Sequence, residues 1–155
     1  MDAEKMSPEE LAKWMQNEHT ALMELNKVLR QHIAAIPEVG LGDWIRGLSA
    51  GFDRLRAHLA RHFAAKEADG YLTLVVEHRP TLSKDVEQIR REHDEIIELA
   101  EHIQRDLSAA RPETRLLVAD VCARVQRFMA VVAGHDEREA MITMLACNLD
   151  IGGTD

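Results

Sequence analysis

Apolar residues recur every three or four positions through four long stretches of the chain, which is the spacing of one face of an α-helix. Clusters of glycine and proline separate the stretches, and none alternates like a half-buried strand. We expect four helices, running from Ser7 to near Pro37, from Asp43 to Asp69-Gly70, from Pro80 onward and from Pro112 to Gly152-Gly153. Residues 71–79 are ambiguous and can continue the second helix. Four amphipathic helices with short connections predict an all-α fold, an antiparallel up-down-up-down four-helix bundle, as a single domain over residues 1–155.

The sequence also marks the ends and inner faces of these helices. Ser7 can cap the first helix, with Pro8 at its first position and Glu10 completing a capping box. Thr81 or Ser83 can cap the third helix. The inner face of the third helix is predicted to hold Val86, Ile89, His93, Ile96, Ala100, Ile103 and Leu107. That of the fourth is predicted to hold Leu117, Val121, Val125, Phe128, Val132, His135, Glu139, Ile142 and Leu149.

A repeat links the two halves of the chain. Residues 17–25 read NEHTALMEL and residues 91–99 read REHDEIIEL, so Glu-His and Glu-Leu recur with an offset of 74. His62 and His135 recur with an offset of 73. This pattern indicates a duplicated helical hairpin whose halves are related by a pseudo-two-fold axis.

The four repeated histidines point to a metal. His19, His62, His93 and His135 fall on the apolar faces of their helices, at heights that agree within about one turn if the second helix passes Gly70. Unpaired buried polar groups are costly, and a bound ion removes that cost. Glu139 follows His135 by one helical turn, so both side chains can reach one ion.

These residues resemble the hemerythrin-like, or HHE, cation-binding family over nearly the whole chain. The family pattern is one histidine on the first helix, His-x-x-x-Glu on the second, one histidine on the third and His-x-x-x-Glu on the fourth. The resemblance implies a non-haem di-iron centre bridged by carboxylates, with His19, His62, His93, His135 and Glu139 as iron ligands. It also implies binding or sensing of a small diatomic ligand, dioxygen or nitric oxide.

One position departs from the family pattern. The bridging glutamate expected four residues after His62 is Lys66, and Glu67 comes one residue later, about 140° around the helix from His62. A π-bulge can restore Glu67 as a metal ligand. Alternatively, Lys66 pairs with Glu139, which leaves a mononuclear or weakened site. In a third interpretation the centre has lost its metal.

The other histidines have weaker claims to a metal. His58, one turn before His62, can be a spare ligand, but a place beside the ligands or on the surface is favoured. His32, His78 and His102 are expected in solvent. No nucleophile stands in a recognisable arrangement with a histidine and an acid, so binding is favoured over catalysis.

The charge and the N-terminal sequence limit the possible binding partners and the expected cellular location. A formal net charge of -8 argues against nucleic acid, and no apolar run is long enough to span a bilayer. No secretory signal is visible, which predicts a cytoplasmic protein with reduced cysteines. The sequence therefore favours an iron protein, in which the missing bridge could also favour another ion such as zinc. The alternative is a metal-free bundle acting as an interaction or regulatory module.

Overall fold

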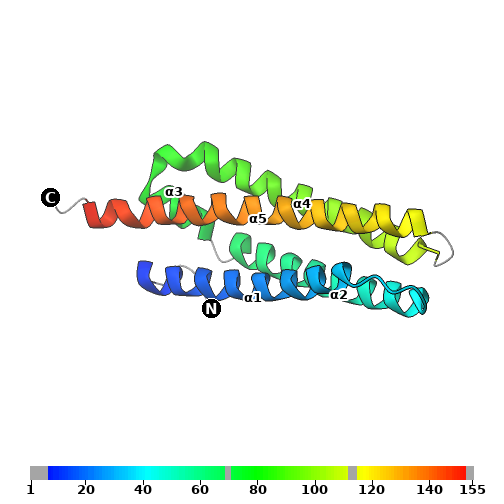
Figure 1. The fold of residues 1–155 in the computed structure, drawn as a ribbon. Helices are drawn as coiled ribbons and strands as arrows, with labels where there is room; N and C mark the ends of the chain where they lie inside the picture. Colours follow the sequence, from blue (N-terminus) through cyan, green and yellow to red (C-terminus); the bar gives the residue numbers. More distant parts are fainter. Residues whose placement is uncertain (1–6, 69–70, 112–114, 153–155) are drawn as a thin grey trace.

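We describe residues 7–68, 71–111 and 115–152 from a computed structural model of the chain. Every regular element in these ranges is helical: α1 (Pro8–Ala34), α2 (Leu41–Ala68), α3 (Tyr71–His78), the 3-10 turn η2 (Pro80–Leu82), α4 (Ser83–Ala109) and α5 (Arg115–Gly152). The four long helices form a bundle, as the sequence predicts (Figure 1). None of the described helices is both long and apolar enough to cross a membrane.

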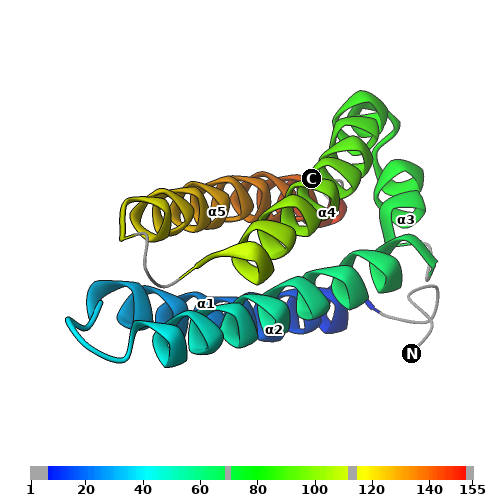
Figure 2. The ribbon, with the colours of Figure 1, turned by 90° about the vertical axis from the view of Figure 1, so that its right-hand side faces the viewer.

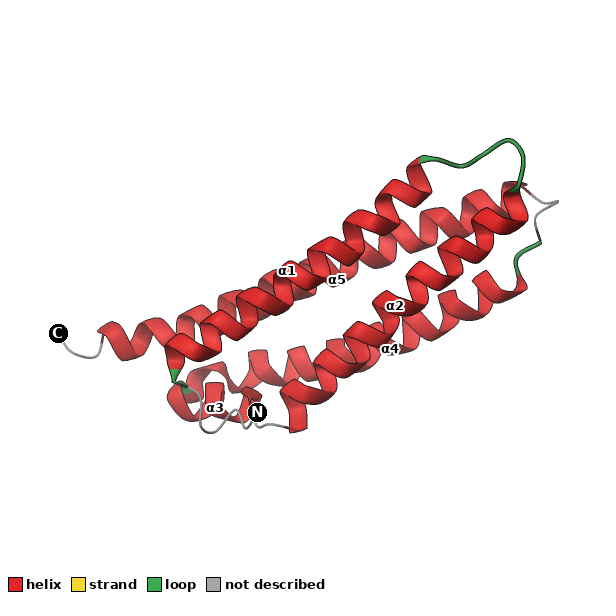
Figure 3. Ribbon diagram, turned by 90° about the horizontal axis from the view of Figure 1, so that it is seen from below, coloured by secondary structure: helices red, strands yellow, loops and turns green. Residues whose placement is uncertain are grey.

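The bundle consists of two helical hairpins. α1 pairs with α2 and α4 pairs with α5, and the two pairs form two layers (Figure 2). α2 also packs against α4, and α1 against α5, which closes the bundle around a common interior (Figure 3). Each hairpin contains one copy of the predicted repeat.

The short helix α3 makes the connection between the hairpins different from the turns within them. It packs against α5, α2 and α4 at one end of the bundle. Its residues Leu72 and Val75 are buried in a small apolar cluster with Met15, Val86 and Ile89. The ambiguous segment 71–79 is thus a separate helix that covers this end of the interior.

The helix ends agree with the sequence in part. Glu10 N donates to Ser7 Oγ at 3.1 Å, so Ser7 caps α1 as expected. The expected cap at Thr81 or Ser83 is wrong: Leu82 precedes α4 without a side-chain cap, because the 3-10 turn leads straight into the helix. The predicted end of the second helix at 69–70 and the predicted start of the fourth at 112–113 lie outside the described residues.

The buried face of α4 was predicted correctly from the spacing of its residues. Its buried residues are the seven predicted ones. On α5 the predicted Leu117 is 53 % exposed, and the neighbouring Val118 is buried in its place. The side chain of the predicted Leu149 lies outside the part that is described. The interior is apolar over most of its described length and becomes polar around His135 and Glu139.

Candidate metal centre

Three of the predicted ligands meet in the interior. His93 comes from α4, and His135 and Glu139 stand one turn apart on α5. Glu139 Oε2 lies 3.0 Å from His135 Nε2 and 3.5 Å from His93 Nε2. All three side chains are buried, and their donor atoms lie within 4.8 Å of one another. Donors bound at 2.0–2.1 Å around a tetrahedral ion stand roughly 3.3 Å apart, so this group fits one ion.

The far nitrogen of each imidazole in this group is held by a carboxylate. His93 Nδ1 lies 3.2 Å from Glu67 Oε1, and His135 Nδ1 lies 2.6 Å from Glu92 Oε2. A carboxylate accepts a hydrogen bond, so it favours the tautomer with the proton on Nδ1 and leaves the Nε2 lone pair free. Both free lone pairs then face the Glu139 carboxylate, and a cation among these three donors relieves their mutual repulsion.

Lys66 supplies a positive charge on the other side of Glu139. Its Nζ lies 2.5 Å from Glu139 Oε1, and both side chains are almost completely buried. α2 is α-helical from Leu41 to Ala68, so no π-bulge brings Glu67 to the place of a bridging ligand. Of the alternatives left open by the sequence, the structure contains the pairing of Lys66 with Glu139.

The ionisation states of Glu139, Lys66 and His62 depend on one another. Burial by itself raises the pKa of Glu139, but Lys66 and the two imidazoles hold that pKa well below its usual range. Burial lowers the pKa of Lys66, although Glu139 opposes that effect. Burial and the nearby Lys66 lower the pKa of His62 from 6.5 to about 3. The interior therefore favours an ionised Glu139 and a neutral His62, which are the forms that bind metal.

His62 and His19 lie outside this group of three. His62 is buried, with its Nδ1 2.8 Å from Glu18 Oε2. The His19 side chain is 45 % exposed, and its Nδ1 pairs with Asp136 on α5. Glu67 is 42 % exposed and contacts the edge of the His93 ring opposite the edge that faces Glu139. Metal ligation by His19, His62 and Glu67 thus remains a prediction.

Apolar surfaces adjoin the centre. Phe63 stacks on His93 at 4.1 Å between ring centroids and meets His135 edge-on at 5.4 Å. A cavity of about 200 Å³ reaches His135 between α4 and α5. It is lined by Gln88, Glu92, Glu95, Ile96, Leu99, Val131, His135 and Arg138. This pocket opens to the surface and lies on the Glu92 side of His135, whereas Nε2 of the same ring faces Glu139.

Two glutamates of the site were missed in the sequence, although the repeat contains them. Glu18 and Glu92 precede His19 and His93 in the repeated Glu-His pairs. In the structure each one contacts the histidine of the other helix in its hairpin, His62 or His135. In each Glu-His pair the glutamate therefore contacts a histidine of the neighbouring helix. The recurrence of the glutamate together with the histidine was the signal that could have identified Glu18 and Glu92.

The remaining histidines have mixed outcomes. His58 stacks on His62 with 5.9 Å between centroids, which agrees with a place beside the predicted ligands. His78 and His102 are exposed, as expected. His32 is not solvated as expected: it is half-buried, its ring stacks on Trp44, and its Nε2 lies 2.7 Å from the Trp44 carbonyl oxygen.

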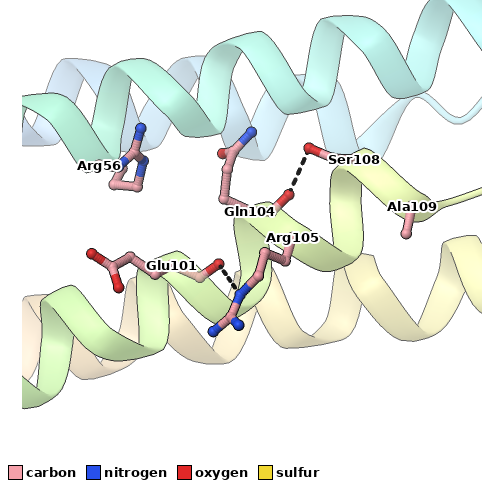
Figure 4. A pocket seen from close by; sticks show the side chains of 6 residues that line it. All are labelled: Arg56, Glu101, Gln104, Arg105, Ser108 and Ala109. Atoms are coloured by element: carbon pink, nitrogen blue, oxygen red, sulfur yellow. Dashed lines mark hydrogen bonds between the residues drawn. The ribbon is translucent and has the colours of Figure 1, made fainter.

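A larger cavity of about 590 Å³ lies between α2 and α4, away from the centre (Figure 4). It is lined by Arg56, Glu101, Gln104, Arg105, Ser108 and Ala109. None of the predicted ligands lines it, and its α4 residues begin two turns beyond His93. This cavity therefore has no part in the centre.

Comparison with known protein families agrees with the geometry. The family profile described as Hemerythrin HHE cation binding domain matches residues 10–145, a range that includes His93, His135 and Glu139. No curated protein and no solved structure matches the chain significantly.

Proposed function

Because the chain belongs to the hemerythrin HHE cation-binding family, we propose that it is a non-haem iron protein that binds dioxygen, nitric oxide or a related small oxidant. Its iron would be held by His93, His135 and Glu139. The observation that carries this proposal is the convergence of two Nε2 atoms and one carboxylate oxygen in the buried interior, with both outer ring nitrogens already held by glutamates. Two imidazoles and one carboxylate form a ligand set that suits non-haem Fe(II) and leaves coordination positions open.

A single ion agrees better with the contacts than the two ions of the family pattern. A carboxylate that bridges two ions uses both oxygens, and Glu139 Oε1 contacts Lys66 Nζ instead. The ammonium group supplies one positive charge at the place where the family pattern has a second bridging carboxylate. We therefore propose a mononuclear centre, with His19 and His62 outside its ligand set.

The surroundings suit a small ligand. The surface pocket beside His135 has Ile96, Leu99 and Val131 in its lining, and its volume of about 200 Å³ is ample for a diatomic molecule. Bound iron would supply a Lewis-acidic, redox-active ion. The nearby ammonium of Lys66 should favour the ferrous over the ferric state, and it also makes zinc an acceptable substitute.

The second candidate function is that of a metal-free helical bundle acting as an interaction or regulatory module. The Lys66–Glu139 ion pair supports it, because this pair neutralises the buried carboxylate without a metal. In that case the proton on one imidazole would take the place of the ion between the two rings.

Metal analysis separates these candidates. The full chain is expressed without a polyhistidine tag, stripped with a chelator and titrated anaerobically with Fe(II), then exposed to dioxygen or nitric oxide while its absorption spectrum is recorded. We expect iron binding that is lost in His93→Gln, together with a spectral change on adding either gas. Absence of any His93-dependent iron would overturn the proposal and favour the metal-free bundle.

A further inference from the structure

One phenyl ring contacts both imidazoles of the centre. Phe63 lies on α2, and its side chain is buried. Its ring stacks on His93 with 4.1 Å between centroids and an interplanar angle of 13°, and it meets His135 edge-on at 5.4 Å and 76°. Aromatic rings favour such stacked and edge-to-face arrangements. A single side chain of α2 therefore touches one ring from α4 and one from α5.

The carboxylates restrain these two imidazoles to different degrees. His135 Nδ1 lies 2.6 Å from Glu92, whose side chain is 12 % exposed and also accepts two hydrogen bonds from Arg138. His93 Nδ1 lies 3.2 Å from Glu67, whose side chain is 42 % exposed. Water competes for an exposed carboxylate, so this second hydrogen bond restrains its ring weakly. The orientation of His93 therefore depends on its other contacts.

The ring contact with Phe63 can fix the plane of His93. Rotation of an imidazole about its terminal side-chain bond has broad, roughly two-fold preferences, so neighbouring atoms must select the orientation. Because the phenyl ring lies nearly parallel at 4.1 Å, the His93 ring cannot turn about this bond without colliding with it. The stack thereby keeps His93 Nε2 toward Glu139, at 3.5 Å, and His93 Nδ1 toward Glu67.

The repeat offers a comparison for this contact. Asp136 is the counterpart of Phe63, with an offset of 73, and it contacts His19. His19 is itself the counterpart of His93, with an offset of 74. The His19 side chain, which pairs with a carboxylate, is 45 % exposed and lies outside the group of three. The His93 side chain, which is covered by a phenyl ring, is 2 % exposed and belongs to that group.

We propose that Phe63 is a positioning residue of the centre, whose ring sets the plane of His93 so that Nε2 faces Glu139. The role of His93 as a ligand rests on the proposed function, whereas the orientation of its ring is a property of the metal-free chain. Without the phenyl ring, His93 should turn between orientations. Metal binding at the centre should then weaken by about 10- to 100-fold, as it does when other groups that orient a metal-binding histidine are removed.

Nuclear magnetic resonance of the metal-free full chain tests the orientation directly. Long-range proton–nitrogen spectra of the tag-free, chelator-treated, ¹⁵N-labelled protein identify the protonated nitrogen of each imidazole, and His93→Gln assigns the signals of that ring. We expect the wild-type His93 to carry its proton on Nδ1. Phe63→Leu removes the ring and should give His93 signals averaged over both tautomers, while those of His135 stay unchanged. Phe63→Met serves the same purpose if the leucine variant does not fold.

A matched control separates positioning from packing. Phe52 is another buried phenylalanine of α2, and its ring meets Phe128 edge-on in the apolar core. Phe52→Leu should therefore lower the free energy of unfolding, as Phe63→Leu does, but keep the wild-type His93 signals and the wild-type affinity for Co²⁺. In Phe63→Leu, Co²⁺ should bind about tenfold more weakly or worse, and the visible absorption of the bound ion should change.

Two outcomes would count against these ideas, and they are distinguishable. Wild-type His93 signals and Co²⁺ affinity in Phe63→Leu would overturn the positioning role of Phe63. A wild-type chain that binds no Co²⁺ would count against the proposed function instead, and the His93 signals of the metal-free variants would then decide the role of Phe63.

Discussion

The two hairpins share a pattern but differ in the chemistry of their interiors. In α4–α5, Glu139 lies one turn after His135, and Arg138 pairs with Glu92. A surface pocket adjoins His135. In α1–α2 the equivalent positions carry Lys66 and Ala65, and His58 and Trp14 pack against His62. The two hairpins thus share their helices but differ in charge, with Lys66 at the position of Glu139, and in the aromatic rings that pack on His62.

The presence of Lys66 in place of a glutamate has a clear electrostatic consequence. Two buried carboxylates facing each other require two metal charges between them, whereas a lysine and a glutamate neutralise each other. The charge of Glu139 is therefore balanced by Lys66 without a metal. For the same reason we expect the centre to hold one ion rather than two.

The largest effect should come from removing the carboxylate that both Lys66 and the imidazoles face. Glu139→Gln should lose the metal bound by His93 and lower the free energy of unfolding of the metal-free protein by about 3–5 kcal/mol, because it leaves the buried Lys66 ammonium unpaired. Urea denaturation and metal analysis measure both effects. Glu18→Gln, in the other hairpin, is the control and should retain the metal at His93. Equal losses of stability in the two variants would remove the distinction between the hairpins.

Restoring the family pattern should make the hairpins more alike. Lys66→Glu should raise the iron content at the centre from one ion to two, because the introduced carboxylate would then bridge two ions together with Glu139. Without metal this variant should be less stable by several kcal/mol, since two buried carboxylates repel each other. Lys66→Met, which removes the charge alone, should leave the count at one. An unchanged count in Lys66→Glu would show that the lysine is not what limits the centre.

A smaller effect is expected from the glutamate that orients His135. Glu92→Gln should weaken metal binding at the centre by about 10- to 100-fold while leaving the number of ions unchanged, because it removes the carboxylate that fixes the His135 tautomer. Glu95→Gln is the matched control, since Glu95 lines the same surface pocket but is exposed. Competition with a chromophoric chelator measures the affinities, and equal values for the two variants would contradict the role of Glu92.

Periodicity was sufficient to predict the bundle and most of its interior. The seven inner residues of α4 follow from helical spacing alone, because one face of that helix is buried along its whole length, against two apolar clusters with His93 between them. Leu117 was misassigned because both it and Val118 are apolar near the start of α5, where spacing alone does not choose between neighbours. The heights of His93 and His135 follow from residue counts, so their meeting with Glu139 was predictable.

The orientation of side chains was not predictable in the same way. His19 lies within the apolar stripe of its helix, yet its ring is half exposed and turned to Asp136, because helical spacing fixes the direction of Cβ but not the rotamer. The contacts of Glu18 and Glu92 cross from one helix to its neighbour, and a single sequence shows such pairs only through the repeat. The 3-10 turn before α4 likewise depends on how α3 packs.

The smallest effect expected is a pH dependence that belongs to one hairpin. In the chelator-treated protein the pKa of His62 is lowered to about 3, whereas in the unfolded chain it is near 6.5. Between these values the unfolded chain binds a proton that the folded chain does not, so stability falls as the pH falls, by about 1.4 kcal/mol per pH unit. Glu139, whose pKa is also lowered, adds to this loss only below about pH 4.5. The free energy of unfolding, measured by urea denaturation between pH 6.5 and 4.5, should therefore fall less steeply with falling pH in His62→Gln than in the wild type. His102→Gln, on the exposed face of α4, is the control, and a wild-type slope in His62→Gln would show that His62 takes up its proton without unfolding the hairpin.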